Sequence, residues 1–397
     1  PSPLASIFNA LLLEGQSEFP HKFILDTWVT PGGLLREIER NLEIQSSKGF
    51  VLSETPKSIC DFLSVAGSNR EYGELSSYNF KNRDLSEVQS FPTEKFDVVL
   101  SFPPMGLPGI KTQFDNGVEI KDTGTSLHFL LSALHQNDEG LGFHILPESF
   151  FSSSSTNSVK DNLHKFGLYI DAVFHIPAGS FHNHVAATNL VIVKRGVSNG
   201  KIFVGEAVSP SEDLVLSKAE EVGPNLGLAK LYWEGKWRNL NQKTLENPII
   251  GTATEASTFT GLPALKRNYE LITLFESIKF PIQRLDEIAK VHSIKKEDVD
   301  NFFQTDDHSH VNLYLTRIHR QTHKNVATSL EEVLLECEMD LEKVHKYWVR
   351  IEIDPEKVIK DALFHYLNSD LGIKAFKAQL TGSSFIPRAS MKNIENL

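Results

Sequence analysis

A short turn at Ser101–Gly106 has the residue types and position that best suit ligand chemistry in this chain. It reads Ser-Phe-Pro-Pro-Met-Gly and follows the β-branched run Val98–Leu100, so we expect a buried strand that ends in a stiff turn. In open α/β sheets, ligands bind outside the carboxyl ends of the strands. Alternation along the strand points the Ser101 hydroxyl to the face opposite Phe102. Taken alone, however, a Pro-Pro pair after a strand can equally be a plain rigid turn.

The sequence around this turn alternates short β-branched runs with helical patterns, which favours βαβ units and a largely parallel sheet. Residues 51–200 show this alternation, whereas residues 201–245 read as short strands and loops. The expected strands contain Val98–Leu100, Gly142–Leu146, Tyr169–His175 and Asn189–Val193, and the expected helices are Ser126–Leu134, Val159–Phe166, Tyr269–Ser277 and Val358–Asn368.

Four linked segments of this region resemble the methylation subunit of type I restriction-modification systems and the related adenine-N6 DNA methyltransferases. They are the Pro-Pro turn, Gly140–Ser149, the Ile-Pro-Ala-Gly-Ser-Phe turn Ile176–Phe181, and Ala187–Lys194 with its Thr-Asn pair. The family has these features in the same order and at similar spacings. The resemblance covers residues 50–195 and implies a methyltransferase-like, doubly wound, mostly parallel α/β sheet that binds S-adenosylmethionine.

The catalytic motif that the resemblance implies has lost its two chemical groups. The family usually reads Asn-Pro-Pro followed by an aromatic residue, and this chain reads Phe102-Pro103-Pro104-Met105. The family's Asn accepts hydrogen bonds from the amine of an adenine flipped out of the duplex, and the aromatic side chain stacks on that base. Phe102 has no acceptor, and Met105 offers only a soft apolar surface. Residues 101–105 therefore form a degenerate catalytic motif, unless Ser101 or a backbone carbonyl replaces the Asn.

The same resemblance implies a cofactor site upstream, opened by Thr55-Pro56. Its candidates are Asp61 and Gly67, Glu74 as the acid for the ribose, and Asp84 as the acid on the adenine side. Each carboxylate can equally be a solvated surface group. Residues 59–96 are also few for the strands and helices that the family has here.

The C-terminal part resembles the specificity subunits of type I systems. The segments that carry this resemblance are Pro281–Ala289, Tyr347–Ile353, Leu363–Ser369, Gly382–Ser384 and Ile386–Ser390. They imply a smaller, mixed α/β target recognition domain that binds double-stranded DNA.

Basic residues with aromatic neighbours occur in the same part of the chain, and such side chains hold phosphates and read base edges. The expected DNA contacts are Arg317, Arg320, Lys324, Lys374, Lys377, Arg388 and Lys392. A solvated charged face is the competing interpretation. His319 and His323 have i, i+4 spacing, but no cysteine joins them, so we expect no metal site.

Composition bounds these interpretations. The chain has 397 residues, 40% of them hydrophobic and 23% charged, and a formal net charge of −11. Such an acidic balance confines any DNA contact to one face or to a surface shared with a partner. Cys60 and Cys337 lie far apart, which excludes a disulfide framework and favours a reducing, cytoplasmic location. No apolar run is long enough for a membrane span, so we expect none. We expect a helical lead (1–50), a methyltransferase-like domain (51–245), a linker with a helix (246–280) and the recognition domain (281–397).

These observations predict a DNA-binding protein of the restriction-modification type, acting beside a methylation, specificity or restriction subunit. Two alternatives stay open: an active DNA methyltransferase, and an acidic scaffold or decoy that does not bind DNA.

Overall fold

The computed structural model divides the chain into two compact units, residues 1–262 and 263–397. It describes residues 3–15, 23–29, 34–35, 38, 46–51, 74–77, 94–103, 105–152, 157–180, 186–208, 218–239, 251–257, 259–276, 283–304, 311–318, 325–380, 388–395 and 397. No described helix is long and apolar enough to cross a membrane.

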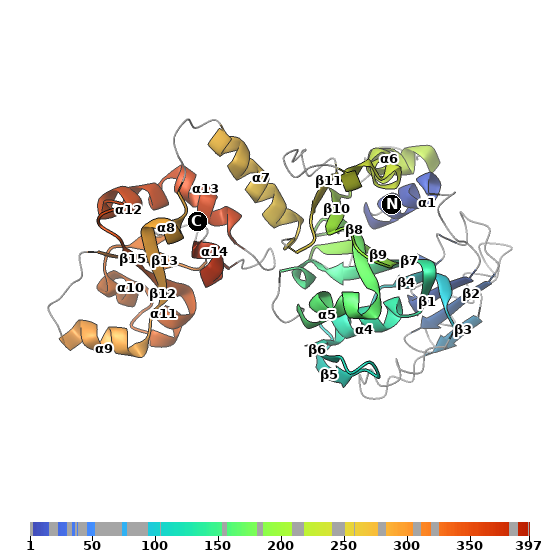
Figure 1. Cartoon of the computed structure of the whole chain (residues 1–397), viewed down its shortest axis with the longest axis horizontal. Coiled ribbons are helices and arrows are strands. Elements are labelled where there is room, and N and C mark those ends of the chain that lie inside the picture. The colour runs from blue at the N-terminus through green and yellow to red at the C-terminus, as the bar shows by residue number, and fades with distance from the viewer. Residues whose placement is uncertain are drawn as a thin grey trace. The chain divides into compact units, whose positions relative to one another are not determined.

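The N-terminal unit is built on a nine-stranded sheet with the order β11-β10-β8-β9-β7-β4-β1-β2-β3 (Figure 1). Its strands are β1 (Phe23–Val29), β2 (Ser46–Val51), β3 (Glu74–Ser77), β4 (Phe96–Ser101), β7 (Gln136–Pro147), β8 (Leu168–Ile176), β9 (Thr188–Arg195), β10 (Lys201–Glu206) and β11 (Thr252–Glu255). Only β9 and β11 run antiparallel to their neighbours in this described sheet. The predicted fold class, a doubly wound and mostly parallel α/β sheet, is confirmed.

The direction of winding changes between β1 and β4. The chain leaves β1 outward through β2 and β3, and then returns to the other side of β1 as β4 before continuing to β7. In open α/β sheets, the crevice at such a switch point, outside the carboxyl ends of the strands, is where ligands bind. The turn after β4 therefore lies at the position where this fold can place a ligand.

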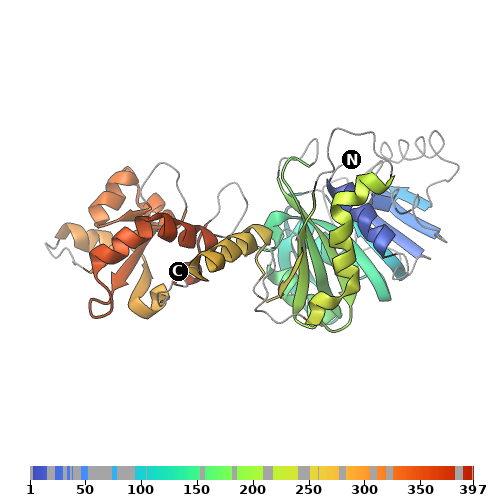
Figure 2. The same ribbon diagram turned by 90° about the horizontal axis from the view of Figure 1, so that it is seen from above.

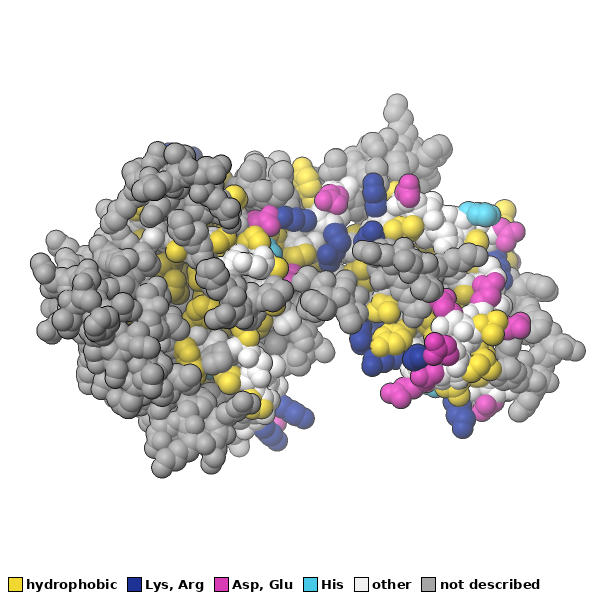
Figure 3. All heavy atoms as spheres, turned by 180° about the vertical axis from the view of Figure 1, so that it is seen from behind, with side chains coloured by type: hydrophobic (Ala, Val, Ile, Leu, Met, Phe, Trp, Pro, Cys, Tyr) yellow, Lys and Arg dark blue, Asp and Glu magenta, His cyan; other side chains and the backbone are white. Residues whose placement is uncertain are grey.

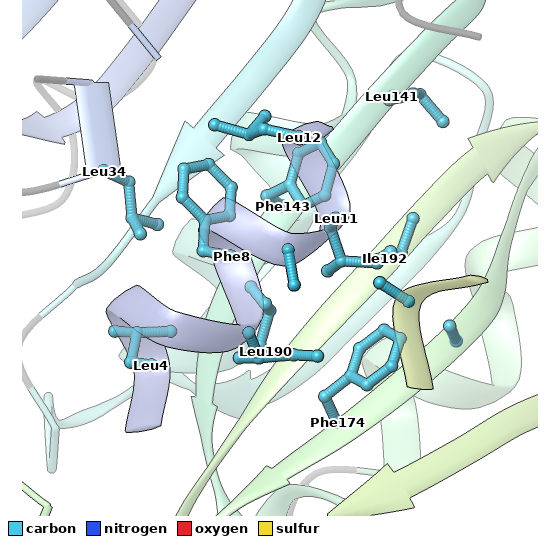
Figure 4. Packing of buried hydrophobic residues seen from close by; sticks show 14 of the residues in the cluster. Leu4, Phe8, Leu11, Leu12, Leu34, Leu141, Phe143, Phe174, Leu190 and Ile192 are labelled. Atoms are coloured by element: carbon cyan, nitrogen blue, oxygen red, sulfur yellow. The ribbon is translucent and has the colours of Figure 1, made fainter. Parts of the chain in front are cut away.

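Helices cover both faces of the sheet. On one face, α1 (Pro3–Glu14) and α6 (Lys218–Glu234) pack on Leu100, Phe143 and Phe174. Figure 4 shows Phe8, Leu11 and Leu12 of α1 lying against the strands, and Figure 2 shows α1 and α6 together on this face. On the other face lie α4 (Gly124–Ala133), α5 (Asn157–Asn162) and the 3-10 turn η4 (Leu163–Phe166). The hairpin β5 (Gly109–Gln113) and β6 (Glu119–Thr123) precedes α4, and the short 3-10 turns η2 (Glu148–Phe150) and η5 (Lys236–Asn239) follow β7 and α6.

Two expectations for this unit are wrong. Residues 1–50 are not a helical lead, because β1 and most of β2 belong to the main sheet. Residues 201–245 are not only short strands and loops, because they hold the 17-residue helix α6. Gly223, Pro224 and Gly227 within α6 read as helix breakers in isolation, but packing against α1 and the sheet overrides their low propensity.

The C-terminal unit is a smaller α/β body around a four-stranded sheet of order β12-β15-β13-β14. The strands are β12 (Ala289–Ser293), β13 (Asn312–Thr316), β14 (Val326–Ala327) and β15 (Trp348–Ile353). The helices are α7 (Leu262–Glu276), α8 (Leu285–Ile288), α9 (Lys296–Gln304), α10 (Leu330–Glu336), α11 (Leu341–Tyr347), α12 (Lys360–Asn368), α13 (Asp370–Ala378) and α14 (Met391–Glu395). The mixed α/β character predicted for this part is confirmed.

Gly372 allows α12 and α13 to approach closely. A Cβ atom at this position would lie 2.0 Å from the Tyr366 carbonyl oxygen and 2.8 Å from Leu367 Cα. Both obstacles are backbone atoms, so the helix would have to shift. We expect Gly372→Ala to lower the free energy of unfolding of this unit by about 3 kcal/mol, measured by urea denaturation. Ala375→Gly, on the same helix, is the control. Its free energy of unfolding should fall by about 1 kcal/mol through lower helix propensity, in addition to the effect of losing a buried methyl group. Equal losses in both variants would contradict the steric argument.

Candidate functional site

The degenerate motif lies at the carboxyl end of β4, beside β1. Ser101 is fully buried, and Phe102 and Met105 are partly buried and pack against the apolar cluster that α1 and α6 form with the sheet. Pro103 is buried, and Pro104 lies outside the described residues. The turn thus directs two apolar side chains to the place where the predicted chemistry needs a hydrogen-bond acceptor and an aromatic ring.

Ser101 points to the other face of the sheet, toward α4. Its Oγ lies 3.2 Å from Nδ1 of His128 and accepts from Ser132 Oγ at 3.5 Å. Thr27 of β1 joins this group: its hydroxyl oxygen is 2.8 Å from Ser132 Oγ and it donates to the Leu100 carbonyl at 3.2 Å. These contacts tie β1, β4 and α4 together in a buried polar network. A fully buried Ser101 in such a network is poorly placed to replace the Asn of an active motif.

Two buried histidines are neutral: His128, which belongs to this network, and His144, which pairs with Ser101 between β4 and β7. Burial lowers the pKa of His128 to about 3, and the pKa of His144 is lowered to about 3 by burial and, second, by His128. His128 packs edge-on against Trp28 at 5.4 Å, and His144 packs against Phe129 at 4.8 Å between ring centroids. A general base near neutral pH needs a pKa close to 7. These imidazoles therefore contribute to packing and do not supply acid–base chemistry.

The predicted cofactor residues are not brought together by the described structure. Asp61, Gly67 and Asp84 lie outside the described residues. Glu74 is the first residue of β3, which runs parallel to β2. It therefore stands at the amino end of its strand, whereas ligands bind at the carboxyl ends. This backbone position disfavours Glu74 as a ribose ligand.

A buried carboxylate in the first strand was not among the predicted site residues. Asp26 lies in β1, is 3% exposed, and its Oδ1 accepts from the Trp28 amide at 2.9 Å. A break in the register between Asp26 and Val29 distorts the strand just before its end. The sequence then reads Thr-Pro-Gly-Gly over 30–33, and a Gly-rich turn after the first strand is typical of nucleotide-binding sheets. The available signal was an acid in an otherwise buried strand followed by a glycine pair.

These residues do not assemble a complete S-adenosylmethionine site within the described part of the chain. Asp26 is a carboxylate near the switch point, but the residues predicted to hold the ribose and the adenine are either undescribed or at the wrong strand end. No methyl-transfer step can therefore be derived through this cofactor from the described residues.

In the C-terminal unit, two of the predicted DNA-contacting arginines lie side by side although they are far apart in sequence. Arg317 Nε donates to the Ala389 carbonyl at 3.1 Å, and a β-bridge joins Ile318 to Arg388. The Arg388 guanidinium lies over the Tyr347 ring at 5.4 Å. Stacking of this kind holds the planar group in a fixed orientation.

The other predicted DNA-contacting residues lie on two helices or outside the described residues. Lys374 and Lys377 lie on α13, with Lys374 exposed, and Lys392 lies on α14, four residues after Arg388. Arg320 and Lys324 lie outside the described residues, as do the four histidines of residues 308–323. On the face drawn in Figure 3, acidic and basic side chains both occur over the described surface of this unit. No group of three metal-ligating side chains occurs among the described residues.

Comparison with known proteins was made for sequence and for structure. No family model matches the chain. No curated protein matches it. Similar solved structures include the methyltransferase subunit of a type I restriction-modification system from Streptococcus thermophilus, at 16% identity and a TM-score of 0.47, over 68% of this chain and 57% of that one. A chain from a structure of a type I restriction-modification system is similar at 16% identity and a TM-score of 0.48, over 70% of this chain and 65% of that one. The M protein of the type I restriction enzyme EcoKI is similar at 13% identity and a TM-score of 0.41, over 55% of this chain and 51% of that one.

The chain spans 57% of the length of the Streptococcus thermophilus subunit. At these identities and TM-scores, the likenesses assign neither a family nor an activity to this chain. What the structure itself defines is the class of fold: an open, mostly parallel α/β sheet with a switch point between β1 and β4, followed by a smaller α/β unit.

Proposed function

We propose that the chain is a DNA-binding protein of the restriction-modification type, with a methyltransferase-like N-terminal unit that no longer transfers methyl groups. The observation that carries this proposal is the position of Phe102 and Met105. They occupy the end of β4 at the switch point of the sheet, where both pack against the apolar cluster. In this proposal, the turn keeps the backbone arrangement of an adenine-N6 methyltransferase site and lacks its acceptor and its stacking ring.

Loss of transfer follows from the chemistry of the substrate. A flipped adenine must have its exocyclic amine held by an acceptor and its ring stacked in the pocket. Phe102 cannot accept a hydrogen bond, and the Ser101 hydroxyl is engaged on the opposite face with His128 and Ser132.

DNA recognition is assigned in this proposal to the C-terminal unit, around Arg317 and Arg388. Double-stranded DNA is the partner, and a methylation, specificity or restriction subunit in the cytoplasm would supply the rest of the positive surface. The net charge of −11 agrees with such sharing. The same charge favours, as a second candidate, an acidic scaffold that binds proteins only.

The test has three steps. DNA is selected on the full chain from a random library, and the chain is then titrated calorimetrically with S-adenosylmethionine, with the selected DNA, and with both. Finally, the selected DNA is incubated with the chain and radiolabelled S-adenosylmethionine to measure methyl transfer. We expect one DNA sequence to be enriched from a random library and no methyl transfer to it from radiolabelled cofactor. Methylated DNA would overturn the loss of activity. Failure to enrich any sequence would instead support the scaffold.

Arg388 gives a sharper prediction. Replacing Arg388 by alanine is expected to weaken DNA binding about tenfold, because one phosphate or base contact is lost. The plot of log affinity against log salt concentration should become shallower by about 1. Lys290→Ala, an exposed lysine of the same unit, is the control and should bind as the unmodified chain does. Equal effects of the two substitutions would argue against a specific role for Arg388.

A further inference from the structure

We propose that a cavity of the N-terminal unit binds a small organic anion with a flat apolar body. The cavity has a volume of about 560 Å³ and lies between α5 with η4, the strands β8 and β10, and the loop that follows β11. Figure 1 shows α5, β8, β10 and β11. Its volume falls within the range of small-molecule sites, about 300–1,000 Å³. The proposal does not depend on the function proposed above.

The cavity is separate from the turn after β4. Leu168 and Ile170 come from the first residues of β8, and Ile202 from the start of β10. Both strands run parallel to β4. The amino ends of β8 and β10 therefore lie on the side of the sheet opposite to the carboxyl end of β4, where the degenerate motif lies. A ligand here would not occupy the crevice at the switch point.

The deeper lining of the cavity is apolar and partly aromatic. Ile170 and Ile202 are buried side chains of the sheet, and Phe151 and Phe259 are buried side chains that line the cavity beside them. The two phenylalanine rings meet edge to face, 5.0 Å apart between centroids. Small-molecule sites are lined mainly by hydrophobic and aromatic side chains of this kind. This lining selects an aromatic or otherwise flat apolar body.

The rim carries groups that favour one negative charge. Lys160 and His164 come from neighbouring turns of α5 and η4, and neither side chain has a hydrogen bond or an ion pair within the described part of the chain. Tyr169 is half-buried, and burial raises its pKa, so its hydroxyl remains a donor at neutral pH. The carboxylate of Asp161 also lines the cavity and disfavours a second negative charge. A monoanion is the ligand that this set accommodates.

The experiment compares two probes that share a naphthalene ring and differ in charge. The full chain is titrated calorimetrically with naphthalene-1-sulfonate and with the uncharged naphthalene-1-methanol. We expect both to bind at one site, the sulfonate more tightly. Lys160→Glu should weaken the sulfonate about tenfold, the effect of one charge contact near a surface, and leave the alcohol within about twofold. Lys165→Glu is the matched control, because Lys165 is exposed on η4 but does not line the cavity.

A second variant tests the location without disturbing the core. Ser257 is exposed at the rim, so Ser257→Trp should obstruct the entrance and weaken both probes at least about tenfold while thermal stability is unchanged. Three results would overturn the proposal: no saturable binding of either probe, equal effects of Lys160→Glu and Lys165→Glu on the sulfonate, or undiminished binding in Ser257→Trp.

Discussion

Replacing Asp171 by alanine is expected to lower the free energy of unfolding of the N-terminal unit by about 3 kcal/mol, the lower end of the loss from breaking a buried ion pair. Asp171 of β8 is 2% exposed and accepts from the Tyr232 hydroxyl at 2.7 Å. It also pairs with Arg238 at 2.9 Å and with Lys194 at 3.1 Å. Removing the carboxylate leaves a fully buried hydroxyl without its acceptor and two cations without their counter-charge. Both cations are partly exposed, so water recovers part of the loss.

This carboxylate also connects distant parts of the chain. Tyr232 lies in α6 and Arg238 in η5, while Lys194 lies in β9. Burial raises the pKa of Tyr232 well above its usual value, and the charge of Asp171 adds to the shift, so the hydroxyl stays a donor. The expected result is therefore weaker packing of α6 against the sheet as well as a lower urea concentration at the midpoint of unfolding.

Urea denaturation followed by tryptophan fluorescence measures this effect, since Trp233 and Trp237 lie beside Tyr232. Asp171→Asn keeps an acceptor for the Tyr232 hydroxyl and should lose less than Asp171→Ala. Glu94→Ala removes the exposed partner of Lys48 and should change stability by less than about 1 kcal/mol. If Asp171→Ala were no more destabilising than Glu94→Ala, the network would contribute nothing to stability.

Acidification from pH 7 to pH 5 is expected to destabilise the N-terminal unit by about 4 kcal/mol through His128 and His144 together. The pKa of each is about 3 in the folded chain, against 6.5 in the unfolded chain. Above pH 6.5 both states are neutral, and the histidines do not make stability depend on pH. Below pH 6.5 the unfolded chain binds protons that the folded chain cannot, so stability falls until about pH 3. At pH 5 this amounts to about 2 kcal/mol for each histidine.

The variant His144→Phe isolates one of the two contributions. Neither ring nitrogen of His144 has a hydrogen-bond partner among the described residues, so a phenyl ring of similar shape replaces it with little loss at pH 7. The difference in unfolding free energy between pH 7 and pH 5 should shrink by about half. His164→Gln removes an exposed histidine and should leave the difference unchanged. A pH dependence that is the same in His144→Phe and in the unmodified chain would contradict the assignment.

The middle of the N-terminal unit could be predicted from sequence because its signals are local. The four expected β-branched runs all lie in strands, β4, β7, β8 and β9, and Ser126–Leu134 coincides with α4 within a few residues. Strand and helix periodicity is set by neighbouring residues, and here it agreed with the tertiary structure.

The elements that were missed owe their formation to distant partners. The polar residues Asp26 and Thr27 obscure β1, and their burial makes sense only with the Leu100 carbonyl and Ser132 beside them. Similarly, α6 is held to α1 by Asn225, which donates to Ser6 Oγ at 2.7 Å, and by Trp233, which donates to the Leu11 carbonyl at 3.0 Å. These contacts join residues more than 200 positions apart, so no local pattern contains them.

By itself, the sequence determined that a β-branched strand ends in Phe102-Pro103-Pro104-Met105, with no hydrogen-bond acceptor in the side chain at 102 and no aromatic ring at 105. The tertiary structure alone decided that the turn lies beside β1 at the switch point, that Ser101 is sealed against His128, and that the acid at the neighbouring strand is Asp26. The physical reason is that side-chain chemistry and periodicity depend on residues that are neighbours in the sequence. Which strands pair depends instead on burial and hydrogen bonding across the whole sheet.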